Sequence, residues 1–234
     1  MAKIVYLETA TQTLSVALAE NTTLLALKET RVANSHSQLV TVFVQQVLAE
    51  AGMTIEAVDA VVVSQGPGSY TGLRIGVSTA KGLCFALGKP LIAVGTLQAM
   101  GYGARINHNE LPADTIICPM LDARRMEVYY ALFDNQLNEI KPDEAAIITD
   151  TYFDAVLKTH RLLLLGDGAE KCRELFDAQP KIELLTDFNM SARYMIEPGL
   201  KKFENQTFEN VAYFEPFYLK DFVAGKANVK GLHG

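Results

Sequence analysis

Residues 61–87 predict a strand, a tight loop and a helix in direct succession, and this unit constrains the fold more than any other stretch. The run from Val61 to Val63 ends at a Gly-Pro-Gly break, as is typical of a short strand buried on both faces. We expect Thr71 to cap the helix, because its hydroxyl can accept a hydrogen bond from an early amide. Gly72 would let another segment of backbone approach closely. The rest of the chain is therefore expected to be built around this unit.

The predicted helix is apolar around more than half of its circumference. At 3.6 residues per turn, one face and its flank carry Leu73, Ile75, Val77, Thr79, Ala80, Leu83, Cys84, Ala86 and Leu87. Only Arg74, Ser78 and Lys81 form a polar strip. A helix of this kind is buried on more than one side. Two interpretations follow: packing within the chain's own fold, or one face kept for another protein chain.

The spacing of the glycines excludes two nucleotide-binding motifs. A Walker A loop needs a Lys-Ser or Lys-Thr pair after its last glycine, whereas Gly72 is followed by Leu73 and Arg74. A dinucleotide-binding loop needs a third glycine where Thr71 stands, and an acidic residue after the next strand, residues 91–94. Neither is present, so the glycines are predicted to shape the loop rather than to bind a nucleotide.

The overall charge argues against a protein that holds nucleic acid by itself. The chain of 234 residues has a net charge of -6, whereas phosphate binding needs a local excess of lysine and arginine. A role in RNA chemistry would therefore need a basic partner.

Cysteine usage and the N-terminal residues predict a cytoplasmic protein. Cys84, Cys118 and Cys172 are odd in number, lack CxxC spacing and are expected to be reduced core thiols. The apolar run at residues 4–7 is too short for a signal sequence or a membrane span. No membrane attachment is expected.

The order of predicted elements is repeated in the two halves of the chain. In the first half, strands are expected at residues 3–7, 14–19, 23–27, 58–64 and 90–94, with helices at 35–52, 71–88 and 96–104. Ser35 and Gln38 match a capping box at the start of the first helix. In the second half, strands are expected at 115–120, 126–133, 145–149, 162–165 and 182–185, with helices at 151–158, 170–176 and 191–203.

This repetition predicts an N-terminal lobe of residues 1–105, a C-terminal lobe of residues 106–220 and a flexible tail over residues 221–234. The fold class is α/β, with duplicated ribonuclease-H-like lobes in which mixed sheets carry helices on both faces. This layout is that of the actin, hexokinase and sugar-kinase (ASKHA) superfamily. It is an analogy of fold, and fold does not determine function.

The helix expected at residues 35–52 also carries a wide apolar arc. The arc consists of Val40, Phe43, Val44, Val47, Leu48 and Ala51, while Val42 lies on the polar side. A stripe that faces the chain's own core explains most of this arc without a partner, but the arc exceeds the ~100° that a one-sided surface helix needs. Both long helices of the N-terminal half therefore have surplus apolar surface.

Several strings of residues closely resemble the bacterial TsaB (YeaZ) family. In the first half they are GPGSYTGLRIGV at 66–77, AKGL at 80–83, LETAT at 7–11, SVAL at 15–18 and His36-Ser37. The match covers the first hundred residues and is specific. In the second half it consists of DARR at 122–125, EVY at 127–129, GDG at 166–168 and YLK at 218–220, and mainly of the shared layout.

The resemblance implies a non-catalytic dimerization subunit of the machinery that places a threonylcarbamoyl group on N6 of the adenosine next to the tRNA anticodon. In that family the subunit is a paralogue of the TsaD-like catalytic subunit, binds it through the two N-lobe helices, and is joined by a TsaE-like accessory ATPase. The implied partner-binding residues are His36, Leu39, Val40, Phe43, Val44, Val47, Leu73, Val77, Ala80 and Cys84. The isolated chain could form a homodimer, and tRNA is expected to be reached only through the complex.

The residues themselves favour the loss of catalysis. The catalytic relative carries an Asn-His-x-x-x-His segment that places two imidazoles one helical turn apart on a metal. Thr96 and Met100 stand where those histidines would be, so we expect neither a metal nor a catalytic residue. His36 is interpreted as a helix-cap histidine, because no acid is placed to orient its ring toward a serine. The chain has no HExxH motif, so the family's glycoprotease-like label has no chemical basis here.

Glu8, Thr9 and Thr11 occupy the place where ATPases of the superfamily put an acid and a phosphate-binding turn. Such turns use glycine so that backbone amides can reach phosphate, but residues 9–13 contain none. A structural carboxylate is favoured over a vestigial nucleotide pocket. No tightly bound cofactor is expected, although ATP or ADP could sit at the joint with the partner. The alternative function is an ATP-dependent kinase or acyl-phosphate enzyme of the same fold, which the glycine-free loop and the short chain disfavour.

Overall fold

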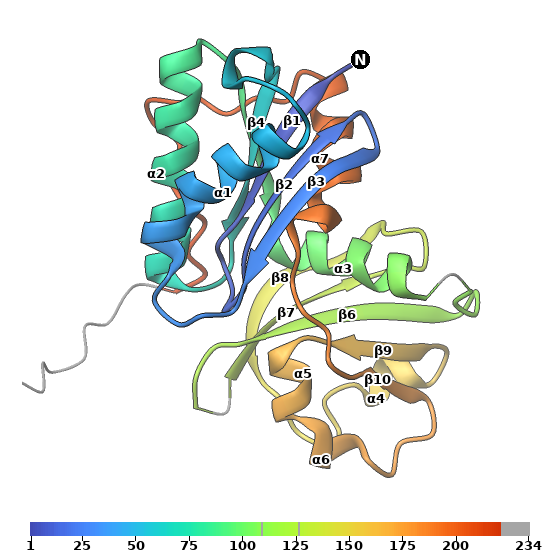
Figure 1. The fold of residues 1–234 in the computed structure, drawn as a ribbon. Coiled ribbons are helices and arrows are strands. Elements are labelled where there is room, and N and C mark those ends of the chain that lie inside the picture. The colour runs from blue at the N-terminus through green and yellow to red at the C-terminus, as the bar shows by residue number, and fades with distance from the viewer. Residues whose placement is uncertain (109, 126, 221–234) are drawn as a thin grey trace, which may run out of the picture.

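Two five-stranded sheets, one in each lobe, organise the chain (Figure 1). The computed structural model describes residues 1–108, 110–125 and 127–220. The first half contains β1 (Lys3–Glu8), β2 (Leu14–Glu20), β3 (Thr23–Thr30), α1 (His36–Glu50), the 3₁₀ turn η1 (Ile55–Ala57), β4 (Ala60–Gly66), α2 (Tyr70–Leu87), β5 (Leu91–Gly95) and α3 (Thr96–Asn107). The two-lobed α/β architecture predicted by the repeated pattern is confirmed. The tail expected at 221–234 lies outside the described residues.

The second half supplies the other sheet and then returns to the first. It contains β6 (Thr115–Asp122), β7 (Glu127–Phe133), β8 (Glu139–Ile147), α4 (Asp154–Leu157), β9 (Arg161–Leu165), α5 (Asp167–Lys171), α6 (Arg173–Phe176), β10 (Ile182–Leu185), the 3₁₀ turn η2 (Ala192–Met195) and α7 (Ile196–Glu204). The sheet order is β10-β9-β6-β7-β8.

The N-terminal sheet has the order β3-β2-β1-β4-β5 and is mixed, because β1 pairs antiparallel with β2 and parallel with β4. Alternate residues of a strand face opposite sides of a sheet. Val61 and Val63 of β4 accordingly pack in the core under α1 and α2, whereas Val62 packs in the core on the other face. All three valines are fully buried, which confirms the strand predicted from the sequence.

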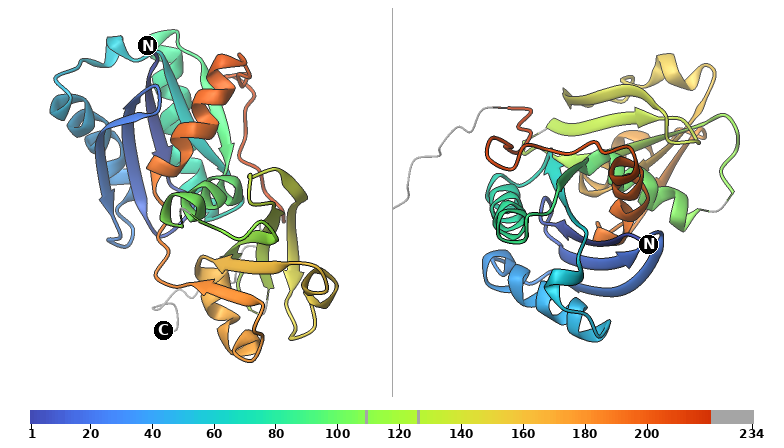
Figure 2. Two further views of the ribbon diagram at one scale, coloured as in Figure 1. Left: turned by 90° about the vertical axis from the view of Figure 1, so that its right-hand side faces the viewer. Right: turned by 90° about the horizontal axis from the view of Figure 1, so that it is seen from above.

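The core on the second face of the N-terminal sheet continues into the C-terminal lobe. It joins Tyr6 of β1 to Met100 of α3, and both to Ile117 and Leu163 of the C-terminal sheet. Figure 2 shows α1 and α2 on one face of the N-terminal sheet and α7 on the other. One continuous apolar cluster therefore holds the two lobes together.

The chain crosses between the lobes twice, so the C-terminal lobe does not extend to residue 220 as expected. After β10, η2 and α7 return to the N-terminal sheet, where a side chain at Gly199 would press against Tyr6 and Val62. Beyond α7, the amide of Glu209 donates to the carbonyl of Leu91, at 2.8 Å, and so stays on this lobe. An amphipathic pattern shows which side of a helix is buried, but it does not say which sheet receives that side.

The starts of the two long helices differ from the sequence prediction. Ser69, and not Thr71, is the N-cap of α2, because its hydroxyl accepts from the amide of Gly72 at 3.2 Å. The capping box expected at Ser35 is also wrong. The Ser35 hydroxyl donates instead to the carbonyl of Val32, at 2.7 Å, and closes the turn before α1.

Element bounds in the second half differ more. β8 begins six residues before the strand expected at 145–149, α4 is shorter than the helix expected at 151–158, and the helices expected at 170–176 and 191–203 are each divided in two. β8 is an edge strand and contains Pro142. Five of its other residues are charged or half-exposed, so the strand has no apolar run. Such a strand carries little periodicity for a sequence pattern to detect.

Candidate functional site

Most of the predicted partner-binding residues lie on the sides of α1 and α2 that face the N-terminal sheet. Those buried in the chain's own core are Val40, Val44, Val47, Leu73, Val77, Ala80 and Cys84. Six of them pack with side chains of β1 and β4, and the fully buried Leu73 lies against Gly66 at the end of β4. A partner cannot reach these residues in this fold, and their assignment to the docking surface is corrected. The reason is physical: the most apolar stripe of a helix packs against its own sheet.

The remaining predicted residues, His36, Leu39 and Phe43, are partly exposed on α1. Nε2 of His36 lies 3.1 Å from the carbonyl oxygen of Thr11, so the ring ties the β1–β2 loop to the start of α1. It does not cap its own helix as expected. Leu39 and Phe43 pack at the border of the core and leave an open apolar edge. Val42 is exposed on the polar side, as predicted.

The outward side of α2 is lined by small residues and is uncovered. Thr71, Ser78, Gly82 and Ala86 are exposed and follow one another at spacings of four or seven, which places them on one side of the helix. Phe85, which is 86% exposed, borders them. A side chain added at Gly82 would meet no atom within 4 Å. We call these five residues the outer α2 face. Small side chains allow another helix to approach closely.

Two residues of the polar strip of α2, Arg74 and Lys81, bind the C-terminal segment of the chain, residues 205–220, which we call the strap. It runs past the end of α2 and along its side (Figure 1). Nζ of Lys81 donates to two strap carbonyls, at 3.2 and 3.0 Å, and Nε of Arg74 donates to the hydroxyl of Tyr218, at 3.3 Å. The strap was missed by the sequence reasoning, for which only the resemblance at residues 218–220 offered a signal. It covers one flank of α2 and leaves the outer α2 face open.

Glu8 is the last residue of β1, and its side chain is fully buried. Its Oε1 accepts from the amide of Ala10 at 2.6 Å, while Oε2 has no hydrogen-bond partner within the described part of the chain. Burial raises the pKa of this carboxyl from 4.5 to about 7, and hydrogen bonds from Ala10, Ser64 and Thr11 oppose the rise. Glu8 is therefore largely uncharged below neutral pH.

Three of the backbone amides of the β1–β2 loop are already engaged within the chain. The amide of Thr9 donates to a serine hydroxyl of β4 at 3.3 Å, that of Ala10 to Glu8, and that of Thr13 to Thr11 Oγ1 at 3.2 Å. A phosphate-binding turn needs such amides directed at the ligand. Glu8, Thr9 and Thr11 therefore fit a structural role better than a nucleotide pocket, and the same geometry disfavours the kinase alternative.

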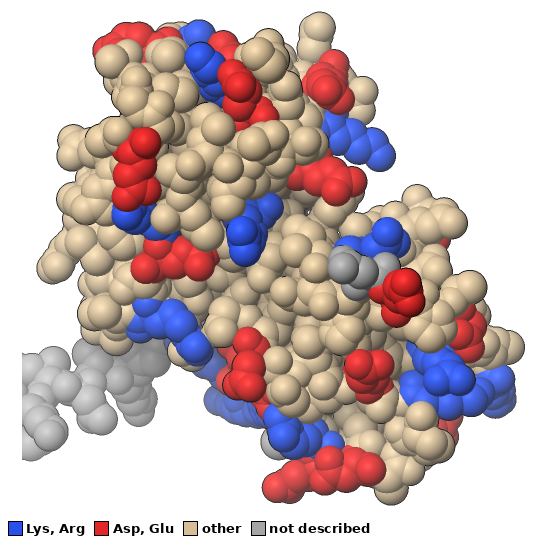
Figure 3. Space-filling view, turned by 45° about the vertical axis from the view of Figure 1, so that its right-hand side comes forward, with Lys and Arg blue, Asp and Glu red and all other residues tan. Residues whose placement is uncertain are grey.

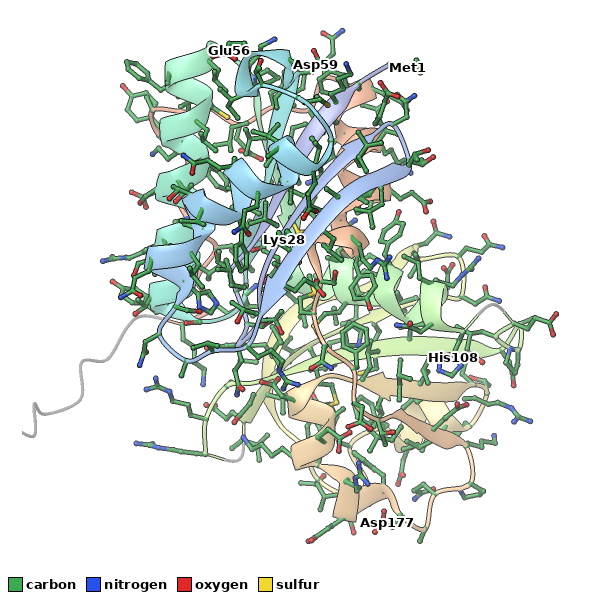
Figure 4. All side chains as sticks on the ribbon, viewed as in Figure 1. Met1, Lys28, Glu56, Asp59, His108 and Asp177 are labelled. Carbon is green, nitrogen blue, oxygen red and sulfur yellow. The ribbon has the colours of Figure 1, made fainter. Side chains whose placement is uncertain are left out.

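Thr96 and Met100, which the resemblance was expected to place at the positions of the catalytic relative's histidines, are buried at the start of α3. The methyl group of Met100 abuts Gly166 of the C-terminal lobe and fills the seam between the lobes. His108 lies at the far end of α3, away from α1 and α2 (Figure 4). Across residues 1–108, 110–125 and 127–220, no group of three or more His, Cys, Asp or Glu could hold a metal ion.

The face shown in Figure 3 and the cysteines carry no further signal of chemistry. Charged side chains of both signs are interspersed over the face shown in Figure 3. Cys84, Cys118 and Cys172 are buried and unpaired, as predicted for core thiols, and burial raises the pKa of Cys84 to about 11. In the described part of the chain, no helix has the length and hydropathy needed to cross a membrane.

Comparison with known proteins relates the chain to one family. The family model described as TsaD, tRNA N6-adenosine threonylcarbamoyltransferase, matches residues 29–213. The tRNA threonylcarbamoyladenosine biosynthesis protein TsaB of Bacillus subtilis is 30% identical over 177 residues, which cover 74% of this chain and 75% of that protein. The protein of the same description from Escherichia coli is 35% identical over 156 residues, which cover 67% of this chain and 62% of that protein.

Solved structures agree with the sequence relatives. YeaZ from Pseudomonas aeruginosa superposes with a TM-score of 0.77 at 25% identity, over 94% of this chain and all of that one. A second crystal structure, of an uncharacterized protein with similarity to the peptidase YeaZ from the same organism, gives a TM-score of 0.79 over the same share. A match to the transferase model is what a paralogue of that subunit would give. The similarity extends over 74% of the chain in sequence and 94% in structure, and the chain therefore belongs to the TsaB (YeaZ) family.

Proposed function

We propose that this chain is the non-catalytic partner subunit required for tRNA N6-threonylcarbamoyladenosine modification, and that it docks on the paralogous catalytic subunit through the outer α2 face and the adjoining edge of α1. The observation that carries the proposal is the open middle of α2, where Gly82 has no neighbouring atom within 4 Å. Phe85 on one border, and Leu39 and Phe43 on α1, supply apolar anchors around it.

The assignment of a supporting role follows from what the seam between the lobes contains. Thr96 and Met100 are packed in the core and offer no ligand for a metal of the catalytic kind. Three of the loop amides that a nucleotide would need, those of Thr9, Ala10 and Thr13, are bonded within the chain. Any ATP or ADP of the complex would therefore bind at the joint with the partner or on the accessory ATPase, and not in this chain's own cleft.

The same surface suggests how the isolated chain behaves. A face that fits a paralogue of the same fold can also fit a second copy of itself, because the two partners share their helices. A homodimer of the free protein would then be replaced by the heterodimer when the catalytic subunit is present. Such an assembly would act in the cytoplasm, where tRNA is modified, and would meet the tRNA as a complex.

Co-elution with the catalytic subunit in gel filtration tests the docking surface. Phe85→Glu should weaken the complex by about 100-fold, because loss of an exposed aromatic anchor and burial of a charge together cost several kcal/mol. Ile147→Glu is the matched control, since Ile147 is also a large exposed apolar residue but lies on β8 of the other lobe. Val47→Glu is unsuitable, because Val47 is fully buried and the variant would report on folding.

The proposal fails if the folded Phe85→Glu variant still co-elutes with the catalytic subunit, and if its co-elution depends on protein concentration in the same way as that of the wild type. It also fails if both glutamate variants lose the complex to the same extent, since the effect would then not belong to the outer α2 face. A circular-dichroism melt of each variant establishes that it is folded.

A further inference from the structure

The turn between β6 and β7 holds two successive arginines in an unusual backbone conformation. Arg124 and Arg125 have φ angles of 70° and 52°, in the left-handed region that favours glycine or asparagine. An L-amino acid other than glycine is destabilised by about 1 kcal/mol or more in this conformation. Both side chains are exposed and pack in none of the hydrophobic cores. Folding alone does not explain the choice of arginine at either position.

The turn is held firmly by groups other than the two guanidinium groups. Oδ1 of Asp122 accepts from the amide of Arg124 at 2.8 Å and from Nζ of Lys171 at 2.6 Å. Lys171 also donates to the carbonyl of Glu127, at 3.0 Å, and Asp167 accepts from the amide of Asp122, at 2.9 Å. The charge of Asp122 is taken up chiefly by Lys171, with a further contribution from the charge of Arg124, and the turn forms a fixed support for the two arginines.

The end of the strap joins this turn to the start of α2. Lys220 forms an ion pair with Glu127 of β7. Two residues earlier, the ring of Tyr218 lies 5.1 Å from that of Tyr70. The guanidinium of Arg74 lies 4.2 Å from the centre of the Tyr70 ring, and its Nε donates to the Tyr218 hydroxyl. The contacts thus connect both lobes into one surface, which we call the arginine–tyrosine patch: Tyr70, Arg74, Arg124, Arg125, Tyr218 and Lys220.

The patch itself brings together four cationic side chains, those of Arg74, Arg124, Arg125 and Lys220, on an acidic protein. The acids beside it are Asp122, Asp167, Glu127 and Glu215. Lys220 is offset by Glu127 and Lys171 by Asp122, whereas none of the ion pairs found among the described residues involves Arg74, Arg124 or Arg125. Glu215 is the acid whose field reaches Arg74. The first turn of α2 contains no acid, so the positive end of its helix dipole adds to the same region.

We propose that the arginine–tyrosine patch contacts the phosphodiester backbone of the RNA substrate when this chain is docked on its catalytic partner. Guanidinium groups on two lobes fit successive phosphates better than a single small anion. Tyrosine rings beside a basic track are the arrangement that accepts unstacked bases. This inference rests on the proposed function, and it makes the chain a direct RNA contact, where its net charge had predicted access only through the partner.

Binding of labelled substrate tRNA to the assembled complex tests the patch. Fluorescence anisotropy would be followed from 50 to 200 mM salt for wild type, for R124Q/R125Q and for the control K158Q/R161Q. Each phosphate contact contributes about 0.9 to the slope of log K against log salt, so R124Q/R125Q should bind less tightly and lower the slope by about two. The control removes the same charge from the other end of the C-terminal sheet. Arg161 pairs with Thr115 at the start of β6, whereas the turn with the two arginines follows the end of β6. The control lies about 20 Å or more away at 3.3 Å per residue and should leave the slope unchanged.

Gel filtration is carried out first, and each outcome has a distinct meaning. If the wild-type complex does not form, the proposed function is overturned, and this inference with it. If the complex forms but R124Q/R125Q keeps the wild-type slope, the inference alone is overturned. Equal losses in R124Q/R125Q and K158Q/R161Q overturn it as a general charge effect. A change in ATP affinity without a change in tRNA affinity overturns it in favour of a small phosphate ligand.

Discussion

Replacing Glu8 by glutamine should remove a large pH dependence from the stability of the fold. The Glu8 carboxyl is fully buried, its Oε2 lacks a hydrogen-bond partner within the described residues, and burial raises its pKa to about 7. Glu8→Gln keeps the shape of the side chain and the oxygen that accepts from the amide of Ala10. It removes the charge that the fold must desolvate when the carboxyl ionises.

The size and sign of the effect follow from the difference between the folded and unfolded states. The pKa is about 7 in the folded chain, against a usual value of 4.5. At 1.36 kcal/mol per pKa unit this corresponds to about 3 kcal/mol. Below pH 4.5 the carboxyl is protonated in both states and costs nothing. Between pH 4.5 and 7 the folded state binds more protons than the unfolded state, so the free energy of unfolding falls as the pH rises. Above pH 7 the full cost is present.

Urea denaturation at pH 4.5, 6, 7 and 8, followed by circular dichroism, measures this difference. The free energy of unfolding of the wild type should fall by about 3 kcal/mol more than that of Glu8→Gln across the series. Glu110→Gln, at an exposed position, is the control and should track the wild type. Parallel curves for wild type and Glu8→Gln would refute the reasoning, because Glu8 would then ionise as freely in the fold as in water.

Two further predictions concern α2. Gly76→Ala should lower the melting temperature, because the added methyl group would collide with Oγ1 of Thr9. Gly82→Ala should instead raise the free energy of unfolding by roughly 0.5–1 kcal/mol, because nothing lies within 4 Å of the added group. Equal shifts of the two variants in thermal denaturation would contradict this reasoning. Lys81→Met should release the strap from α2, because two carbonyl hydrogen bonds are lost. Chymotrypsin should then cleave near Tyr213 faster than in the wild type, and an unchanged cleavage rate would show that Lys81 does not hold the strap.

The buried strand and the two-lobed layout could be predicted because they depend on local patterns. Val61 to Val63 form an uninterrupted β-branched run, and only a strand covered on both faces accommodates it. The sequence pattern does not identify the N-cap of α2, because Ser69 and Thr71 lie two residues apart and either hydroxyl could accept from an early helix amide. Which one caps depends on where the backbone leaves the extended region, with Ser69 at a ψ of 117°.

The residues of the docking surface were harder to predict, because a pattern along one helix does not show which of its sides the rest of the chain covers. Hydrophobic periodicity finds the most apolar side of a helix, and on α2 that side carries Leu73 and Cys84 into the chain's own core. The outer face is built from small residues such as Gly82, which have no apolar signature. The strap could not be foreseen either, because Lys81 reaches backbone carbonyls more than 130 residues later in the chain. Every residue of any chain has a backbone carbonyl, so the sequence does not indicate which of them Lys81 binds.

The central claim is that this chain contributes a docking face and no reactive centre. Reconstitution of threonylcarbamoyl transfer to tRNA, with purified catalytic subunit, accessory ATPase and threonylcarbamoyl donor, tests it most directly. The account predicts no product from this chain alone, product when the wild-type chain is added to the catalytic subunit, and loss of product with Phe85→Glu in proportion to the loss of complex. Product formed by this chain without the catalytic subunit, or full turnover with a Phe85→Glu variant that no longer binds, would contradict the account.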